Sequence, residues 1–399
     1  MTPPVPRRAF AAFWTSSTYF AEGLPYSVVH QISAQFFTAS GASLQAIGLT
    51  SLYGLAWNLK FLWSPLIDVF SNKKSWLVGF ELLIAAAIAV LTWPALSLNL
   101  DTAAKIFVMI AFLAATQDMA VDGYYIQSLN DADQAAFSGL RVAAYRIALL
   151  VGNGALVVLA GMASWVICFL TAAGIMAALA MFHQVFLPKA PAMETPFKAS
   201  MVEEAFVTYL QQPHIVWILA FILVYRAGDA MMFAMATPLL NELGYDTAAR
   251  GFVSGTLGTL CGISGALLGG AIISRAGLRR CLFPFTLIQS LSIPAYAWMA
   301  YVRPGLFGVG LVIAFEQLAA GIGTAALLVF LMQRCNRNFQ ATHFAIGSAL
   351  MSVAATLAGS ISGYVASGVG FALFFSIAFV ISWPGVVMAW LMPARVHHY

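Results

Sequence analysis

The segment "AAKIFVMIAFLAATQDMAVDGYYIQSL", residues 103–129, decides the fold. The segment is longer than the roughly 20 residues that an α-helix needs to cross a bilayer, and its first half is apolar apart from Lys105. Its second half carries two aspartates, Asp118 and Asp122, among residues that are otherwise lipid-soluble. The segment therefore predicts a membrane-spanning helix whose two carboxylates need a separate explanation.

The composition of the whole chain agrees with a membrane protein. Of its 399 residues, 61% are hydrophobic and 9% are charged, and the mean hydropathy is +0.86. Soluble domains carry roughly 25% charged residues, because water must hydrate their surface. The apolar runs are continuous and do not alternate as the strands of a transmembrane barrel do. The sequence thus predicts an all-α polytopic membrane protein with about twelve spans.

One long connection divides the predicted spans into two groups. Residues 188–212 are polar and interrupted by prolines, so we expect a cytoplasmic linker between an N-terminal six-helix lobe, 1–187, and a C-terminal six-helix lobe, 213–399. The expected helices are 10–38, 43–70, 75–97, 103–129, 137–161, 163–187, 213–241, 247–274, 280–302, 305–334, 340–367 and 370–392.

The two halves repeat one another. "GASLQAIG" at 41–48 aligns with "GYDTAARG" at 244–251, and "NKK" at 72–74 then falls near "RAGLRR" at 275–280. Repeats related by an axis along the membrane normal are how secondary transporters build two lobes around a central site. The chain contains no Walker motif and no "HExxH", which argues against a nucleotide-driven engine and a zinc protease. We expect no enzymatic activity, no cofactor and no metal.

Basic residues give the orientation. Placing the N-terminus in the cytoplasm leaves only Lys105, Arg250 and Arg303 on the opposite side. This bias satisfies the positive-inside rule and predicts that both termini are cytoplasmic. The net charge of +4 is therefore not a nucleic-acid signal. The cytoplasmic basic residues would be Arg7, Arg8, Lys73, Lys74, Lys189, Lys198, Arg275, Arg279, Arg280, Arg334, Arg337 and Arg395.

Charged residues within the predicted spans follow a pattern. A charge at the bilayer centre costs about 2.5 to 3.5 kcal/mol even on the most lenient scale. Six such residues fall on the first helix of each successive triplet, which is where a two-lobed transporter lines its central cavity. We therefore predict a wet substrate cavity, lined by Glu22, Tyr26, Gln117, Asp118, Tyr125, Arg226, Asp229 and Glu316.

The two aspartates lie four residues apart and share a helix face. Two nearby carboxylates in a low dielectric are costly to ionise together, which predicts that Asp118 carries a coupling proton, with Glu22 and Asp229 as further candidates. Asp122 and Arg146 are expected at equal depth and would form a structural ion pair.

Other polar residues in the spans have competing interpretations. Arg226 and Asp229 either neutralise each other or offer a cation to an anionic solute. Lys60, between Trp57 and Trp63, is interpreted as a structural cation. Five aromatic residues could stack on a sugar or another apolar ring, namely Tyr26, Trp57, Tyr124, Tyr125 and Tyr145.

Several stretches resemble a known family. They are "KFLWSPLID" at 60–68, "ATQDMAVDGYY" at 115–125, "AYRIALLVGNG" at 144–154, "VYRAGDAMMFAMATPLL" at 224–240 and "FEQLAAGIGTAALLVFLMQRCNRNFQATHFAIGSAL" at 315–350. In order and in both halves, they resemble the AmpG-like muropeptide permease branch of the peptide, acetyl-CoA and drug transporters, within the major facilitator superfamily. The resemblance implies twelve helices in two lobes, alternating access and proton-driven import of an anhydro-muropeptide.

The resemblance also implies gating loops and shows one departure. Asp68 takes the place of the acidic gating residue, and Ser274 replaces it in the second lobe. Muropeptide permeases commonly have a basic residue where Tyr125 stands, so the preferred charge of the site has changed here. The gating residues would be Asp68, Lys73, Lys74, Arg275, Arg279 and Arg280.

Two functional alternatives remain beside muropeptide import. One is transport of a siderophore or acetyl-CoA by the same fold, and the other is a membrane sensor or partner subunit that no longer transports. The acidic residues in the spans argue against the sensor, because a protein that does not transport would have no need of them. We expect a monomer in the bacterial cytoplasmic (inner) membrane, with a small-molecule solute, protons and the lipid bilayer as its partners and no nucleic acid.

Overall fold

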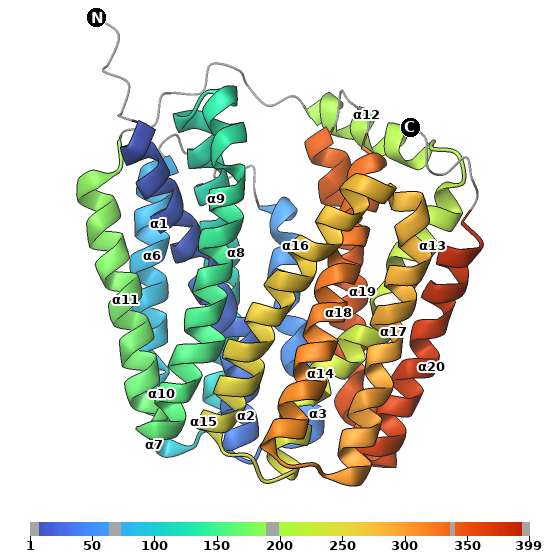
Figure 1. The fold of residues 1–399 in the computed structure, drawn as a ribbon. Coiled ribbons are helices and arrows are strands. Elements are labelled where there is room, and N and C mark those ends of the chain that lie inside the picture. Colours follow the sequence, from blue (N-terminus) through green and yellow to red (C-terminus); the bar gives the residue numbers. More distant parts are fainter. Residues whose placement is uncertain (1–7, 64–72, 189–198, 336–339, 393–399) are drawn as a thin grey trace, which may run out of the picture. The chain divides into compact units, whose positions relative to one another are not determined.

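Every regular element in the described residues is a helix. The computed structural model describes residues 8–63, 73–188, 199–335 and 340–392 (Figure 1), and no strand occurs in these ranges. Helical structure occupies each of the twelve predicted ranges, as far as they are described. The all-α prediction is therefore confirmed.

In the described residues, the first six predicted spans contain ten α-helices and short connecting turns. A π-helical turn, Val28–Ile32, follows three residues after Pro25 and interrupts the first span. The α-helices are α1 (Arg8–Ser27), α2 (Ser33–Ala39), α3 (Leu44–Leu49), α4 (Leu55–Leu59), α6 (Lys73–Val90), α7 (Thr92–Ser97), α8 (Leu100–Ser128), α9 (Asp131–Leu149), α10 (Val157–Met162) and α11 (Trp165–Phe186).

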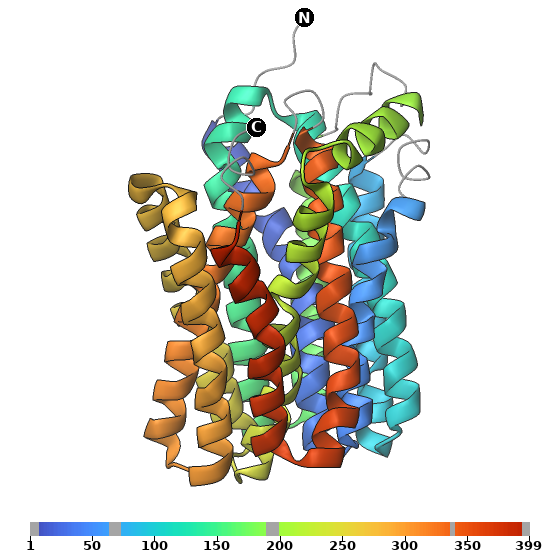
Figure 2. The ribbon, with the colours of Figure 1, turned by 90° about the vertical axis from the view of Figure 1, so that its right-hand side faces the viewer.

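The second half begins with a short helix that lies across the others. This helix, α12 (Ala199–Leu210), runs over the ends of the long helices of its unit (Figure 1, Figure 2). The remaining helices are α13 (Ile215–Tyr225), α14 (Ala227–Glu242), α15 (Thr247–Arg250), α16 (Gly258–Ala276), α17 (Leu278–Val302), α18 (Leu306–Gln333), α19 (Gln340–Val369) and α20 (Phe371–Trp390).

Nine helical stretches among the described residues are long and apolar enough to cross a membrane. The three predicted spans outside this set differ for visible reasons. Residues 8–39 and 44–62 contain many polar side chains, including Thr15, Gln35 and Asn58, which lower their hydropathy. The third, α17, is continuous but carries buried polar side chains, including Gln289, Ser290 and Ser292, which lower its hydropathy.

The chain forms two compact units, and each takes one short segment from the other half of the sequence. These exchanged segments, 42–54 and 246–256, overlap the two "G…G" repeats at 41–48 and 244–251. The placement of the lobe boundary within 188–212 stays a prediction. The first unit contains Met1–Gly41, Leu55–Pro196 and Asp246–Thr256, and the second contains Ala42–Gly54, Phe197–Tyr245 and Leu257–Tyr399.

Residues 246–256 are anchored firmly in the first unit. The side chain of Asp246 caps α15 by accepting a hydrogen bond from the Ala249 amide at 2.7 Å. Arg250 is buried and donates from Nε to Gln35 Oε1 at 3.1 Å. A Cβ added at Gly255 would overlap the carbonyl oxygen of Asn153. The backbones approach so closely here that only glycine fits.

We expect Gly255→Ala to lower the free energy of unfolding by about 1 to 3 kcal/mol, the usual cost of overpacking. Gly270→Ala is the matched control, because no atom of a neighbouring residue lies within 4 Å of a Cβ at Gly270, which also lies within a helix. Thermal unfolding in detergent measures both variants. Equal midpoints would contradict the close backbone contact at Gly255.

The second unit uses the same small-residue packing. Segment 42–54 lies against α19, where Gly363 allows the close approach of the Leu44 carbonyl and Gln45 Nε2 donates to Ser367 Oγ at 2.8 Å. Helices α16 and α18 meet through Gly265 and Gly321, and a Cβ at either would overlap a backbone carbonyl of the partner helix. The small residues of α16 therefore serve helix packing.

Candidate functional site

Four charged side chains lie close together in the first unit, those of Glu22, Lys60, Asp118 and Asp122. Lys60, within the second predicted span, 43–70, pairs with Asp118 on α8. The Glu22 carboxyl group on α1 lies within hydrogen-bonding reach of that of Asp118 and within electrostatic reach of Lys60 and Asp122. The structure thus brings together two predicted proton-coupling residues, Glu22 and Asp118, with a cation between helices.

Lys60 has a more specific contact than the sequence suggested. Sequence analysis interprets it as a structural cation between two tryptophans, and the structure gives it an acidic partner, Asp118, on another helix. The side chains are 32% exposed for Lys60 and 13% for Asp118, so the pair is partly open. Lys60 therefore belongs to the candidate site.

Glu22 is the more isolated of the two acids. Within the described part of the chain, no hydrogen-bond partner reaches its buried Oε2 atom. A buried carboxyl oxygen without a partner is costly when it carries charge. In this arrangement Glu22 has the stronger reason to hold a proton, whereas Lys60 compensates the charge of Asp118.

Asp122 pairs with a different arginine from the predicted one. Its Oδ1 accepts from Arg141 NH2 at 2.8 Å and from the Tyr19 hydroxyl at 2.6 Å. The prediction that Asp122 pairs with Arg146 was wrong. Helix α9 begins at Asp131, six residues before the predicted start at 137. The two arginines are five residues apart, about 7.5 Å along a helix, so the misplaced helix start led to the wrong arginine.

The Asp122–Arg141 pair should show a measurable coupling in a double-mutant cycle. Both side chains are partly exposed, at 43% and 33%, so we expect Asp122→Asn and Arg141→Gln to be coupled by about 1 kcal/mol in unfolding. Unfolding in SDS–detergent mixtures measures each variant. The cycle with Arg146→Gln is the control and should be additive; coupling there and not at Arg141 would refute the pairing.

The predicted aromatic residues separate into two clusters. Tyr26 stacks on His30 with 4.0 Å between ring centroids, and Trp57 meets both rings edge-on at 5.3 and 4.9 Å. Tyr145 lies 5.8 Å from Tyr26, and all four side chains are partly buried. We call Tyr26, His30, Trp57 and Tyr145 the aromatic patch. Sequence analysis did not identify His30, because no charged residue or motif next to it pointed to a function.

Tyr124 and Tyr125 take part in packing inside the first unit. The Tyr124 hydroxyl donates to the Pro188 carbonyl at 2.8 Å, and the Tyr125 hydroxyl donates to that of Gln134 at 2.6 Å. The Arg141 guanidinium lies 4.6 Å from the Tyr125 ring centroid. These contacts supply a cation beside Tyr125, the place where the sequence appeared to have lost one.

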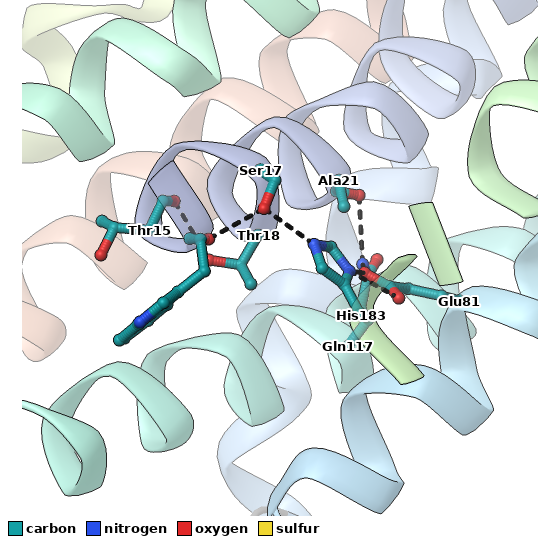
Figure 3. A network of polar contacts seen from close by, with 8 residues as sticks. Thr15, Ser17, Thr18, Ala21, Glu81, Gln117 and His183 are labelled. Atoms are coloured by element: carbon teal, nitrogen blue, oxygen red, sulfur yellow. Dashed lines mark hydrogen bonds and ion pairs between the residues drawn. The ribbon is translucent and has the colours of Figure 1, made fainter. Parts of the chain in front are cut away.

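Gln117 points into the interior of the first unit. Its Nε2 donates to the Ala21 carbonyl at 3.1 Å and to Glu81 Oε1 at 3.5 Å (Figure 3). Glu81, in turn, pairs with His183. Sequence analysis placed Gln117 in the cavity, but its side chain is buried and engaged with α1 and α6. It did not find Glu81 or His183 as a pair.

In the second unit, Arg226 and Asp229 pair with each other. Arg226 NH2 donates to Asp229 Oδ2 at 2.8 Å. The predicted single helix 213–241 breaks at Arg226, so Asp229 lies in the first turn of α14, where the helix dipole favours a negative charge. Glu316 is fully buried and accepts from the Tyr296 hydroxyl at 3.3 Å and from Gln317 Nε2 at 3.1 Å.

The predicted gating residues are only partly described. Asp68 lies outside the described residues. Lys73 is buried, and Lys74 donates from Nζ to the Leu187 carbonyl at 2.7 Å. Their gating role stays a prediction. The second-half residues Arg275, Arg279 and Arg280 are exposed where α16 ends and α17 begins.

Apolar helices of membrane-spanning length around partly exposed charged side chains are typical of membrane transporters. The profile of the Major Facilitator Superfamily matches residues 11–342. The chain belongs to this superfamily, and it is a multi-pass membrane transporter, not an enzyme.

Known relatives narrow the classification of the chain within the superfamily. It is 32% identical to the anhydromuropeptide permease of Escherichia coli K12, over 92% of this chain and 77% of that protein. An uncharacterized Haemophilus influenzae protein is 28% identical over 95% of this chain and 93% of its own length. A crystal structure of a D-xylose–proton symporter is 10% identical, with a TM-score of 0.77 over 98% of this chain and 99% of its own. The resemblance to AmpG-like permeases is confirmed.

Proposed function

We propose that this transporter imports an anhydro-muropeptide, or a similarly bulky amphipathic solute, together with protons. It would act by alternating access in the bacterial cytoplasmic membrane, with both termini in the cytoplasm. The observation that carries the proposal is the contact of Glu22, Asp118 and Lys60 inside the first unit.

The Glu22–Asp118 contact supports proton coupling because of hydrogen-bond chemistry. Ionised carboxylates only accept hydrogen bonds, so two carboxyl groups can bond to each other only when one is protonated. The positive charge of Lys60 and a proton can each neutralise the Asp118 carboxylate, so the two compete for it. Loss of the proton would leave two negative charges beside one lysine, which favours a rearrangement of the site. Proton loading can therefore bias one conformation over another.

Two features support the identity of the solute. The first is the name of the Escherichia coli relative, an anhydromuropeptide permease. The second is the aromatic patch, since Tyr145 lies close enough to Glu22 and Asp118 to interact with them electrostatically. Partly buried aromatic rings beside charged groups can bind a sugar ring and its polar substituents together. Arg141 restores the positive charge that Tyr125 appeared to remove.

Uptake by proteoliposomes tests the proposal. Purified protein is offered labelled anhydro-muropeptide, siderophore or acetyl-CoA, with and without an imposed pH gradient. We expect accumulation of the muropeptide only when the external side is acidic. Accumulation of another solute would change the substrate, and equal uptake without the gradient would refute proton coupling. Absence of transport for all three would favour a sensor or partner subunit.

The topology can be tested by chemical labelling. In a background without Cys168, Cys261, Cys281 and Cys335, single cysteines at Ala42 and Ala199 should be labelled from opposite sides of the membrane. The reason is the bias of twelve basic residues against three. An impermeant thiol reagent added to intact cells should modify only the cysteine at position 42. Modification of both from outside would refute the orientation.

A further inference from the structure

A second polar network lies buried in the first unit, apart from the acids that we assign to coupling. His183 on α11 contacts both oxygens of Glu81 on α6 from Nδ1, at 2.7 and 2.9 Å, and its Nε2 lies 3.0 Å from Ser17 Oγ on α1. The side chains of Glu81 and His183 are 0% exposed. Figure 3 shows this network and Gln117 of α8 between α1 and Glu81.

The hydrogen bonds of this network hold one another in place. The Ser17 hydroxyl donates to the Trp14 carbonyl at 3.0 Å, which leaves its oxygen to accept from His183 Nε2. His183 then donates from both ring nitrogens, one to Ser17 and one to Glu81. This assignment satisfies all the contacts at once. The bonds among Ser17, His183 and Glu81 hold these three side chains rigidly, because each missing bond would strand a buried polar group.

Gln117 connects this network to the coupling acids. Its amide nitrogen lies 3.1 Å from the Ala21 carbonyl and 3.5 Å from Glu81 Oε1. Ala21 directly precedes Glu22, and Gln117 directly precedes Asp118. One amide group therefore ties α1 to α8 beside the two carboxyl groups that touch each other.

We propose that Glu81, His183 and Ser17 position Gln117, and that Gln117 fixes the spacing between Glu22 and Asp118. The proposal rests on the proposed function, because that spacing matters only if the two acids share a proton. Gln117 is a positioning residue that acts through the backbone at Ala21, since the structure gives it no contact with Lys60. Displacing it would loosen α1 against α8 and weaken the hydrogen bond between the acids.

Infrared spectroscopy tests the spacing without any solute. The carbonyl stretch of protonated carboxyl groups should be present in the purified protein, and the component from Glu22 should be lost in Glu22→Gln. In Gln117→Leu, which keeps the size but removes both donors, we expect this band to shift. Gln289→Leu is the matched control, because Gln289 is an equally buried amide in the other unit. An unshifted band in folded Gln117→Leu would overturn the proposal, whatever the protein transports.

Transport adds a readout that a purely structural role would not change. We expect Gln117→Leu to retain solute exchange between equal pools but to lower accumulation under a pH gradient by roughly fivefold to tenfold. Failure of the wild-type protein to accumulate solute would refute the proposed function and leave the infrared result to decide the positioning. Exchange and accumulation that fall together by the same factor would overturn it.

Two double variants separate positioning from loss of the ion pair. Glu81→Gln with His183→Gln removes the charges but keeps an acceptor for Gln117, so we expect the infrared band and the accumulation of the wild type. Glu81→Leu with His183→Leu also leaves no unpaired charge, yet removes the acceptor, and should behave like Gln117→Leu. Equal behaviour of the two double variants would overturn the proposal.

Discussion

Glu22→Gln is expected to retain exchange of solute between equal pools and to abolish accumulation against a gradient. Glutamine resembles a protonated glutamate in shape and hydrogen bonding, so the contact with Asp118 can persist without a titrating proton. A transporter that is fixed in its protonated form can still cycle with solute bound, but a pH gradient no longer drives it. Proteoliposomes with an imposed gradient should reach equal concentrations on both sides.

The control for this prediction is Glu242→Gln. Glu242 is half-exposed and meets Arg303 at the end of α14, at 3.3 Å, so the same chemical change there should leave accumulation unchanged. If Glu22→Gln still concentrates solute as the wild type does, the proton travels through another acid. Asp229 in the second unit would then become the better candidate.

The sequence predicted the helices because their signal is local. Continuous apolar runs and polar connections give each span its position, and the structure has helices in all twelve ranges. The breaks within spans were harder to predict. Arg226 interrupts one predicted helix, and a π-helical turn at Val28–Ile32 interrupts another. Such breaks depend on tertiary contacts that hydropathy does not report.

The sequence predicted which residues matter better than it predicted their partners. Glu22 and Asp118 lie together as expected of one site, but Lys60 was interpreted as a structural cation and Arg141 was not singled out. A pair between two helices depends on their relative depth and rotation, and one sequence fixes neither. An error of a few residues in a helix end is enough to exchange Arg146 for Arg141.

Glu81 and His183 illustrate a different limit. Glu81 lies near the predicted cytoplasmic end of its helix, where a charge needs no special explanation, and His183 lies 102 residues away in the sequence. The structure buries both side chains completely. Nothing in the local pattern marks two distant polar residues as partners, because their burial comes from four helices packing together.

Lys60→Met is the second substitution with a large expected effect. Removing one member of a fully buried ion pair costs about 3 to 5 kcal/mol, because the other charge is stranded. The Lys60–Asp118 pair is partly exposed, so we expect a loss of about 2 kcal/mol in the free energy of unfolding. Less folded protein should reach the membrane, and uptake per folded molecule should also fall, since the acids lose their compensating charge.

Combining Lys60→Met with Asp118→Asn separates these two effects. The double variant has no stranded charge, so its unfolding midpoint should return toward that of the wild type. Accumulation should remain lost, because neither the cation nor the pair of carboxyl groups is left to respond to a proton. Lys105→Met, at an exposed lysine on the same helix as Asp118, should change neither property. A double variant as unstable as the sum of its two single variants would show that Lys60 and Asp118 do not compensate each other.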